Sequence, residues 1–255
     1  MLALKEIKTL QRDPKARLKL GLFIVEGIKM FRETPPDLIE QICLSESFEK
    51  EHGREVIARI GRERAAAISE IIPDSRMEKL SDTRSPQGVL LVVRQMKWEM
   101  EAVLNKEAPL ILLLEDVQDP GNVGTILRTA DAAGFDGVLL SPDCADVFSP
   151  KVLRATMGSI FRVGLAFPRD LPARLAELKS EGFSVLSSQL DGTPFYDREN
   201  VGPKLVLIVG NEGNGVSEAV RRVATHHLRL PMRGGAESLN AAIAAGIMMY
   251  DLMRT

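Results

Sequence analysis

Short apolar runs recur through the second half of the chain, and most are followed by a stretch whose apolar positions have helical spacing. The runs predict strands at Leu110–Leu114, Gly137–Leu140, Val163–Phe167, Phe183–Leu186 and Leu205–Val209. The stretches predict helices at Asn122–Ala133 and Leu171–Glu181, and a last helix from about Ser238 to the end. Strands that alternate with helices in this way are typical of a mostly parallel sheet with helices on both faces. The sequence therefore predicts an α/β fold for this half.

The first hundred residues show a smaller, mixed pattern. Strands are predicted at Leu22–Val25, Leu38–Leu44 and Val89–Val93, and helices at Gly27–Arg32, Arg54–Arg64 and Ser75–Leu80. This combination is typical of a small α+β domain. A polar helical stretch at residues 96–108 separates it from the first strand of the second half. We therefore expect a first domain at residues 1–98, a linker at 99–107 and a second domain at 108–255.

Composition places the chain among globular proteins, with 45% hydrophobic and 27% charged residues. No apolar stretch approaches the roughly 20 residues that a membrane-spanning helix needs, and the start has no signal-peptide core. Cys43 and Cys144 lie in different halves, and the three histidines do not add a ligand set of ordinary zinc spacing. We expect a cytoplasmic protein that binds no membrane and no metal.

The net charge of −2 argues at first against a nucleic-acid partner, but the charges are unevenly distributed. Residues 1–98 hold 18 Lys/Arg against 15 Asp/Glu, and the first 20 residues hold six basic side chains against two acidic ones. Lys15 and Arg17 are among the six. Such an N-terminal segment either binds phosphates or forms a solvated helix face, and the sequence leaves both alternatives open.

Three polar, glycine-containing segments follow apolar runs in the second half. The first extends from Glu115 to Arg128 and contains Asp-Pro-Gly-Asn, which predicts a turn at Pro120-Gly121 with Asn122 as the N-cap of a helix. Arg128 lies under two helical turns beyond Asn122. An arginine there is usually an exposed helix cation, although its planar donor group can also hold a phosphate or a developing alkoxide.

The second segment, Gly210-Asn-Glu-Gly-Asn-Gly215, follows the predicted strand Leu205–Val209. Its three glycines permit positive φ and close approach of a ligand to the backbone. The spacing is G-x-x-G-x-G, which differs from the dinucleotide fingerprint, and no Gly-Lys-Ser/Thr follows as in a P-loop. Glu212 suits either a helix cap or a ligand-binding loop.

The third segment extends from Leu230 to Asn240 and ends in Ser238-Leu-Asn240. Ser238 is a plausible N-cap for the last helix, and Asn240 would be unremarkable by itself just inside that helix. Each of the three segments alone is weak evidence, because glycine turns are common in α/β proteins. Their order and their polar residues together are more specific.

The three segments together resemble the motifs of the SpoU (TrmH) family of RNA 2′-O-ribose methyltransferases, within the knotted SPOUT superfamily. The resemblance covers residues 110 to 255. Phe23-Ile-Val-Glu-Gly27 and Ser81-Asp-Thr-Arg-Ser-Pro-Gln-Gly88 extend it, because they resemble the ribosomal-protein-like (L30e-like) RNA-recruiting domain often found at the N-terminus of this family. The resemblance implies a deep trefoil knot from Gly210 onward, S-adenosylmethionine as methyl donor, RNA as substrate and a homodimer. Ala241, Ala244 and Ala245 offer a small-residue face for that dimer, unless they pack within one subunit.

The resemblance also implies roles for individual residues. The catalytic group would be Arg128, with Asn122, Glu212, Ser238 and Asn240 around it. S-adenosylmethionine would be held by Gly210, Asn211, Gly213, Leu230, Met232 and Leu239. RNA would be contacted by Arg128, Arg154, Lys15 and Arg17, although Arg154 equally suits an internal ion pair. Ala242 stands where relatives often have a serine, so detailed transfer of roles is weaker at that point.

The expected function is methyl transfer to a ribose 2′-hydroxyl, with ribosomal RNA favoured over tRNA because of the recruiting domain. Two alternatives from other classes remain. A nucleotide-dependent oxidoreductase suits the fold but not the glycine spacing. A non-catalytic RNA-binding protein suits the domain pattern, but the chain retains the polar residues of all three segments.

Overall fold

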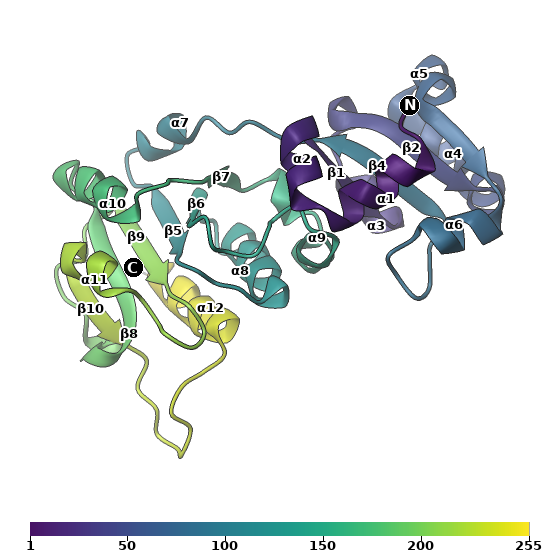
Figure 1. The fold of residues 1–255 in the computed structure, drawn as a ribbon. Helices are drawn as coiled ribbons and strands as arrows, with labels where there is room; N and C mark the ends of the chain where they lie inside the picture. The colour runs from purple at the N-terminus through teal and green to yellow at the C-terminus, as the bar shows by residue number, and fades with distance from the viewer. Residues whose placement is uncertain (255) are drawn as a thin grey trace. The chain divides into compact units, whose positions relative to one another are not determined.

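The computed structural model describes residues 1–254, and its contacts divide the chain into two compact units (Figure 1). Unit 1 comprises Met1–Lys97 together with Asp146–Phe161. Unit 2 comprises Trp98–Ala145 and the chain from Arg162 onward. The sequence pattern assigns Asp146–Phe161 to the second domain, whereas its contacts group it with the first. The chain therefore passes between the units three times.

Unit 2 contains a sheet of six strands in the order β10-β8-β9-β5-β6-β7. Their bounds are β5 Leu110–Leu114, β6 Gly137–Leu140, β7 Gly164–Ala166, β8 Ser184–Pro194, β9 Leu205–Val209 and β10 His226–Arg229. All neighbouring pairs in this order are parallel. The prediction of an α/β fold with a mostly parallel sheet is confirmed.

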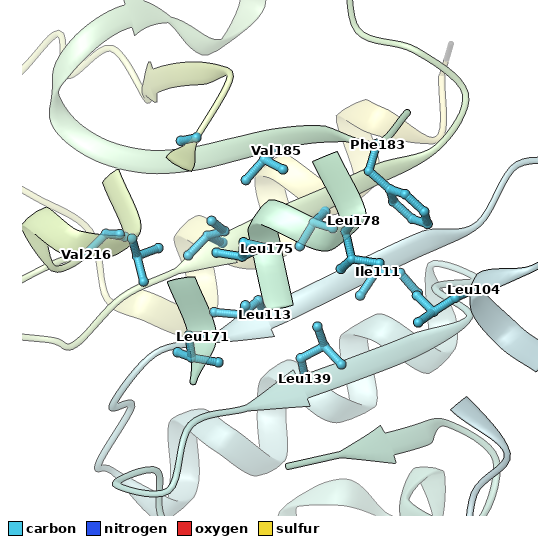
Figure 2. Packing of buried hydrophobic residues seen from close by; sticks show 14 of the residues in the cluster. Leu104, Ile111, Leu113, Leu139, Leu171, Leu175, Leu178, Phe183, Val185 and Val216 are labelled. Atoms are coloured by element: carbon cyan, nitrogen blue, oxygen red, sulfur yellow. The ribbon is translucent and has the colours of Figure 1, made fainter. Parts of the chain in front are cut away.

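Helices cover both faces of this sheet. They are α7 Met100–Leu104, α8 Pro120–Ala132, α10 Leu171–Ser180, α11 Glu218–Val223 and α12 Ala241–Leu252. One face packs Ile111, Leu113 and Leu139 against Leu175 and Leu178 of α10 (Figure 2). Because side chains alternate along a strand, Leu112 and Leu114 are buried on the opposite face. On that opposite side α12 contacts both β9 and α8.

Among the α-helices and strands of unit 2, α11 and β10 were not predicted. The segment of β10, His-His-Leu-Arg, holds a single aliphatic residue, so its strand conformation comes from parallel pairing with β8 rather than from an apolar run. The last helix begins at Ala241, three residues later than expected, and its N-cap is Asn240 rather than Ser238. The prediction of Ser238 as the cap is therefore wrong.

Unit 1 has a four-stranded sheet in the order β1-β4-β2-β3, and the pairs are antiparallel except for β2 with β3. The strands are β1 Leu22–Glu26, β2 Ile39–Ser45, β3 Ser69–Ile72 and β4 Val89–Arg94. The helices are α1 Leu4–Arg12, α2 Pro14–Leu20, α3 Ile28–Glu33, α4 Glu46–Ile60, α5 Arg62–Ile68, α6 Asp74–Leu80 and α9 Pro150–Thr156. A small α+β unit is thus present at the N-terminus, with one strand, β3, that the sequence pattern did not indicate.

The segment Asp146–Phe161 is built into the core of unit 1. The Phe23 ring of β1 lies 4.9 Å from the Phe148 ring and 6.3 Å from the Phe161 ring, centroid to centroid. The guanidinium of Arg17 donates to Asp146 Oδ2 at 2.6 Å from Nη2. The Arg17 side chain is 4% exposed and that of Asp146 is 30% exposed, so the arginine end of this ion pair is shielded from water. The first ninety-seven residues by themselves therefore lack part of their own core.

Candidate active site

The first polar segment leaves β5 beside β9 and leads into α8. The cap of α8 is Asp119, whose Oδ1 accepts a hydrogen bond from the Asn122 backbone N–H at 2.8 Å. Pro120 and Gly121 occupy the first helical positions rather than a turn. The expectation that Asn122 caps this helix is therefore wrong, and the side chain of Asn122 is left for other partners. Proline at the first helical position was the signal that pointed to Asp119.

The second segment forms a tight loop after β9. Asn211 and Gly215 exchange two backbone hydrogen bonds, of 3.0 and 2.9 Å. A Cβ added at Gly210 would lie 2.3 to 2.4 Å from backbone atoms of Gly215 and Val216, so only glycine fits there. Gly215 is the one residue of this loop with positive φ, at 68°. Gly210 is thus required by the loop's own backbone.

Asn211 uses its side chain to shape the same loop. Its Oδ1 accepts the backbone N–H groups of Gly213 and Asn214, both at 2.9 Å, and its Nδ2 donates to the Asp116 carbonyl at 2.8 Å. The loop is therefore held by internal hydrogen bonds and is tied to the first segment. Its polar groups are preorganised before any ligand is present.

The side chain of Glu212 extends from this loop to the N-terminus of α8. Its carboxylate accepts the backbone N–H groups of Gln118 and Asp119, both at 3.1 Å, and the side-chain amide of Asn122 at 2.9 Å. Partial burial of the carboxyl opposes ionisation, but the hydrogen bonds from Asn122 and from backbone amides outweigh it and lower the pKa of Glu212. Glu212 is therefore an ionised acceptor at neutral pH.

The third segment joins the other two through Asn240. Its Nδ2 donates to Asn122 Oδ1 at 2.9 Å, while its Oδ1 accepts the backbone N–H groups of Ala242 and Ile243 and so caps α12. Asn122 thus accepts from Asn240 and donates to Glu212 through opposite ends of one amide. The predicted convergence of Asn122, Glu212 and Asn240 is present as a continuous chain of side-chain hydrogen bonds.

Arg128 and Ser238 are not part of this chain. Arg128 follows Asn122 by six residues on α8, so its side chain leaves the axis about 120° away from that of Asn122. It is exposed, and it makes no hydrogen bond or ion pair with the rest of residues 1–254. Ser238 is exposed in the third segment. Within a single chain, neither Arg128 nor Ser238 forms a hydrogen bond with the Asn122 amide.

The segment before Asn240 is extended and open (Figure 1). Across the part of the chain that the structure describes, the backbone of residues 231–239 makes no hydrogen bonds. Leu239 is 37% exposed, Met232 is half-buried and Leu230 is nearly buried. Free amides can donate and free carbonyls can accept hydrogen bonds, and together with exposed apolar side chains they suit an uncharged purine ring and its ribose. The residues present therefore fit the adenosyl group of S-adenosylmethionine.

The residues of unit 1 predicted to contact RNA differ in their exposure and in whether they already have hydrogen-bond partners. Lys15 is exposed, whereas Arg17 is buried and donates to Asp146 and to the carbonyls of Leu10 and Gln11. Because its guanidinium is buried and already bonded, Arg17 is not a candidate for binding phosphate. Arg154 donates to Asp82 Oδ2 at 3.0 Å, which matches the internal ion pair considered from the sequence, and its side chain stays 38% exposed.

Sequence reasoning missed two further contacts beneath the site. Glu115, which is 7% exposed, accepts the backbone N–H of Ser217 at 2.8 Å and its hydroxyl at 2.6 Å. Ser141 Oγ accepts the backbone N–H of Asp116 at 2.8 Å. A carboxylate directly after a wholly apolar strand was the available signal for the first contact. Nothing in the sequence pattern indicated the second.

Two negative findings complete the description. Within residues 1–254, no three His, Cys, Asp or Glu side chains converge in a way that could hold a metal ion. No helix in the same range combines the length and the apolar character that a membrane crossing requires.

Comparison with known proteins places both units in recognised groups. A model of the SpoU rRNA Methylase family matches residues 109–250, and a model of the MRM3-like substrate binding domain matches residues 3–91. The 23S rRNA (guanosine(2553)-2′-O)-methyltransferase RlmP of Bacillus subtilis is 35% identical over 241 residues, which cover 93% of this chain and 91% of that protein.

Two solved structures show how far the likeness extends. The AdoMet-bound rRNA methyltransferase of Sinorhizobium meliloti is 28% identical and has a TM-score of 0.83, over 98% of this chain and 94% of that one. The TrmH/SpoU tRNA modifying enzyme of A. aeolicus is 29% identical and has a TM-score of 0.52, over 60% of this chain and 78% of that one. The first likeness thus includes both units, and the second includes little more than half of the chain.

Proposed function

The chain belongs to the SpoU rRNA methylase family, and on that premise we propose that it transfers a methyl group from S-adenosylmethionine to a ribose 2′-hydroxyl of ribosomal RNA. The family predicted from the three polar segments is confirmed. The hydrogen-bond chain Glu212–Asn122–Asn240 carries the proposal, because it joins all three segments at one point.

S-adenosylmethionine supplies an electrophilic methyl group on a positively charged sulfur. Methyl transfer from this cofactor would give a ribose methyl ether and a neutral thioether, and the hydroxyl proton would pass to solvent. The protein must hold oxygen and carbon about 3 to 3.5 Å apart and stabilise the charge that develops on oxygen. These two tasks fall to different residues.

We assign positioning to Asn122, Glu212 and Asn240. Because Glu212 is ionised, it fixes which end of the Asn122 side chain carries the NH₂ group, and the donor from Asn240 fixes the other end. Ser238, on the exposed segment directly before Asn240, is assigned to the edge where ribose and methyl donor meet. We assign stabilisation of the ribose oxygen to Arg128, whose planar guanidinium donors have no partner within residues 1–254.

We assign cofactor binding mainly to the backbone of Leu230–Leu239. Its unpaired amide and carbonyl groups can hold the adenosyl group, with Leu230, Met232 and Leu239 around the adenine. Gly210, Asn211 and Gly213 contribute by fixing the shape of the neighbouring loop. An apolar slot with main-chain donors suits this cofactor better than a phosphate cradle, because S-adenosylmethionine carries no phosphate.

We assign RNA recruitment to unit 1, which matches a substrate-binding model and presents Lys15 and other basic residues on α1 and α2. Ribosomal RNA is favoured over tRNA as the substrate. The rRNA-methylating relatives match nearly the whole chain, whereas the tRNA-modifying structure matches only 60% of it. We also propose a cytoplasmic location, which is supported by the proposed ribosomal RNA substrate.

Two finer features of the family fold belong to the proposal. We infer a deep trefoil knot formed by the chain after β9, which is supported by the central position of β9 in the sheet between β8 and β5. We also infer an L30e-like fold for the N-terminal unit, which is supported by its mixed four-stranded sheet with helices. Both features agree with the family but rest on resemblance.

We further propose a homodimer built on α12. Ile243, Ile247 and Tyr250 are 55%, 37% and 50% exposed and form one stripe along this helix. Of the three alanines predicted for the dimer face, Ala245 is fully buried within the subunit, whereas Ala241 and Ala244 are partly exposed and lie beside the apolar stripe. A partner against the apolar stripe would bring a second α8 near the site, which gives the outward-facing Arg128 a place to act.

The decisive experiment is nucleoside mass spectrometry of ribosomal RNA from a deletion strain, with methyl transfer by the purified protein onto that RNA in parallel. One missing 2′-O-methyl nucleotide that the protein restores supports the proposal. A restored tRNA nucleotide points to the tRNA alternative, and RNA binding without transfer points to a non-catalytic RNA-binding protein. For the dimer, Ile243→Asp should shift sedimentation toward the 28.0 kDa monomer.

A further inference from the structure

Asp116 adopts an unusual backbone conformation directly after Glu115 at the end of β5. Its φ is 55°, a left-handed value that among the non-glycine residues of 1–254 occurs only at Met157 (53°) and Asn200 (57°) as well. Side chains other than glycine, asparagine and aspartate rarely adopt this region, because Cβ crowds the backbone there. Such conformations persist only where the surrounding contacts impose them.

Ser141, at the end of the neighbouring strand β6, supplies those contacts. Its hydroxyl accepts the Asp116 backbone N–H at 2.8 Å and donates to Asp116 Oδ1 at 2.5 Å. Ser141 is 5% exposed, and its own backbone N–H donates to Leu114. One buried hydroxyl therefore holds both the backbone and the carboxylate of Asp116.

The turn at Asp116 determines how the first two site segments meet. Its carbonyl accepts Asn211 Nδ2 at 2.8 Å, and the Oδ1 of Asn211 holds the amides of the glycine loop. Beyond the turn, the N–H groups of Gln118 and Asp119 reach the Glu212 carboxylate. A different φ at Asp116 would turn this backbone away from both partners.

We propose that Asp116, locked by Ser141, is a positioning residue for methyl transfer. It sets the glycine loop and Glu212 against the start of α8, and thereby fixes the Asn122 amide. It touches neither substrate nor cofactor in this role. The inference deepens the proposed methyltransferase function and rests on it for the catalytic consequence, whereas the structural relationship can be tested without any ligand.

Four variants distinguish a positioning role of Asp116 from a general loss of stability caused by backbone strain. Asp116→Asn keeps a residue type that tolerates positive φ and retains an oxygen acceptor for Ser141. Asp116→Val forces a β-branched residue into the same conformation. Ser141→Ala removes the lock while leaving Asp116 unchanged, which keeps the test valid where Asp116→Val fails to fold. Asn200→Val is the matched control, because it imposes the same strain within unit 2 away from the site segments.

The first readout is hydrogen exchange at the amides of Gln118, Asp119, Gly213 and Asn214 in the protein without cofactor. Asp116→Val and Ser141→Ala should speed exchange at all four, by about tenfold or more, since these amides lose their acceptors. Asp116→Asn should stay close to wild type. Asn200→Val should lower Tm without affecting the four amides.

The second readout is single-turnover methyl transfer at saturating S-adenosylmethionine. Asp116→Val should fall at least about tenfold and Asp116→Asn should stay within about threefold. Equal Tm losses for Asp116→Val and Asn200→Val, with unchanged exchange at the four amides, would overturn the inference. So would an Asp116→Asn variant as damaged as Asp116→Val. A wild-type protein that methylates no RNA would instead remove the proposed function and leave the exchange result to judge Asp116.

Discussion

Asn240 donates a hydrogen bond from Nδ2 to Asn122 Oδ1 at 2.9 Å across 118 positions of sequence. The other end of the same Asn240 side chain caps α12. One residue thus has two separable tasks, since the cap uses its oxygen and the contact with Asn122 uses its nitrogen. The two tasks can be tested by replacing only the side-chain nitrogen in one variant and by removing both polar atoms in another.

Asn240→Asp should retain the helix cap but lose methyl transfer. Aspartate caps helices as well as asparagine does, so thermal stability should change little. The new oxygen would face Asn122 Oδ1 without a proton to share, so the rate should fall about tenfold or more. Asn240→Ala should reduce the rate and also cost about 1 kcal/mol of stability through the lost cap. Calorimetry with single-turnover kinetics compares the two, and equal rates for Asn240→Asp and wild type would contradict the assigned contact.

Glu212→Gln should disturb the site in a way that depends on pH. The folded-state pKa of Glu212 is lowered, so its contribution to stability is fully present above the unfolded value and is lost as pH falls through the folded one. The stability difference between wild type and Glu212→Gln should therefore be constant near neutral pH and shrink below the ordinary carboxyl value of 4.5. Urea unfolding from pH 3 to 8 measures it. A difference that grows on acidification would show that Glu212 is not held as a carboxylate.

Gly210→Ala should deform the loop after β9, because a Cβ there would meet backbone atoms at 2.3 to 2.4 Å. We expect at least about a tenfold loss of S-adenosylmethionine affinity together with a lower Tm. Gly202→Ala is the matched control, since its Cβ would meet only Ser184 Oγ at 3.5 Å, its φ is not positive and it lies outside the three site segments. Calorimetric titration distinguishes them. Equal affinities in the two variants would mean that the loop tolerates the displacement.

Arg128→Ala should reduce turnover by at least about a hundredfold, a loss near 2.7 kcal/mol of transition-state stabilisation. S-adenosylmethionine affinity and Tm should stay unchanged, because Arg128 is exposed and makes no hydrogen bond or ion pair within residues 1–254. Arg222→Ala, which removes an exposed arginine of α11, serves as the control. Full single-turnover activity in Arg128→Ala would reduce the arginine to a surface residue.

Substitutions of Arg17 and of Lys15 should affect different properties, stability for Arg17 and RNA binding for Lys15, although the two residues are only two positions apart. Arg17→Ala leaves Asp146 without its buried partner and should cost about 3 kcal/mol of stability. Lys15→Ala should leave stability unchanged and weaken RNA binding, with a smaller dependence of affinity on salt. Thermal unfolding and RNA titration at two salt concentrations separate the effects. A Lys15→Ala variant with an unaltered salt dependence would exclude Lys15 from the RNA surface.

The convergence of Asn122, Glu212 and Asn240 was predicted from the family resemblance, and the order of the strands explains part of it. Asn122 and Glu212 follow the carboxyl ends of β5 and β9, which are parallel neighbours, and polar residues at such ends lie close together. The burial of Arg17 could not be foreseen, because its partner Asp146 lies 129 positions away. The φ of Asp116 depends likewise on a hydroxyl from another strand. Contacts between distant parts of the chain leave no periodic signal in the sequence.

Unit 1 includes Asp146–Phe161, and this has a consequence for synthesis on the ribosome. A translating ribosome releases the first ninety-seven residues well before the segment that supplies Phe148 and Asp146. We expect Phe23 and Arg17 to remain without their core partners until residue 161 has emerged, so that the N-terminal unit closes only after β5 and β6 of the parallel sheet have been made. Force-sensitive arrest of nascent chains of increasing length would locate that step, and arrest release near residue 97 would show that the unit folds without the late segment.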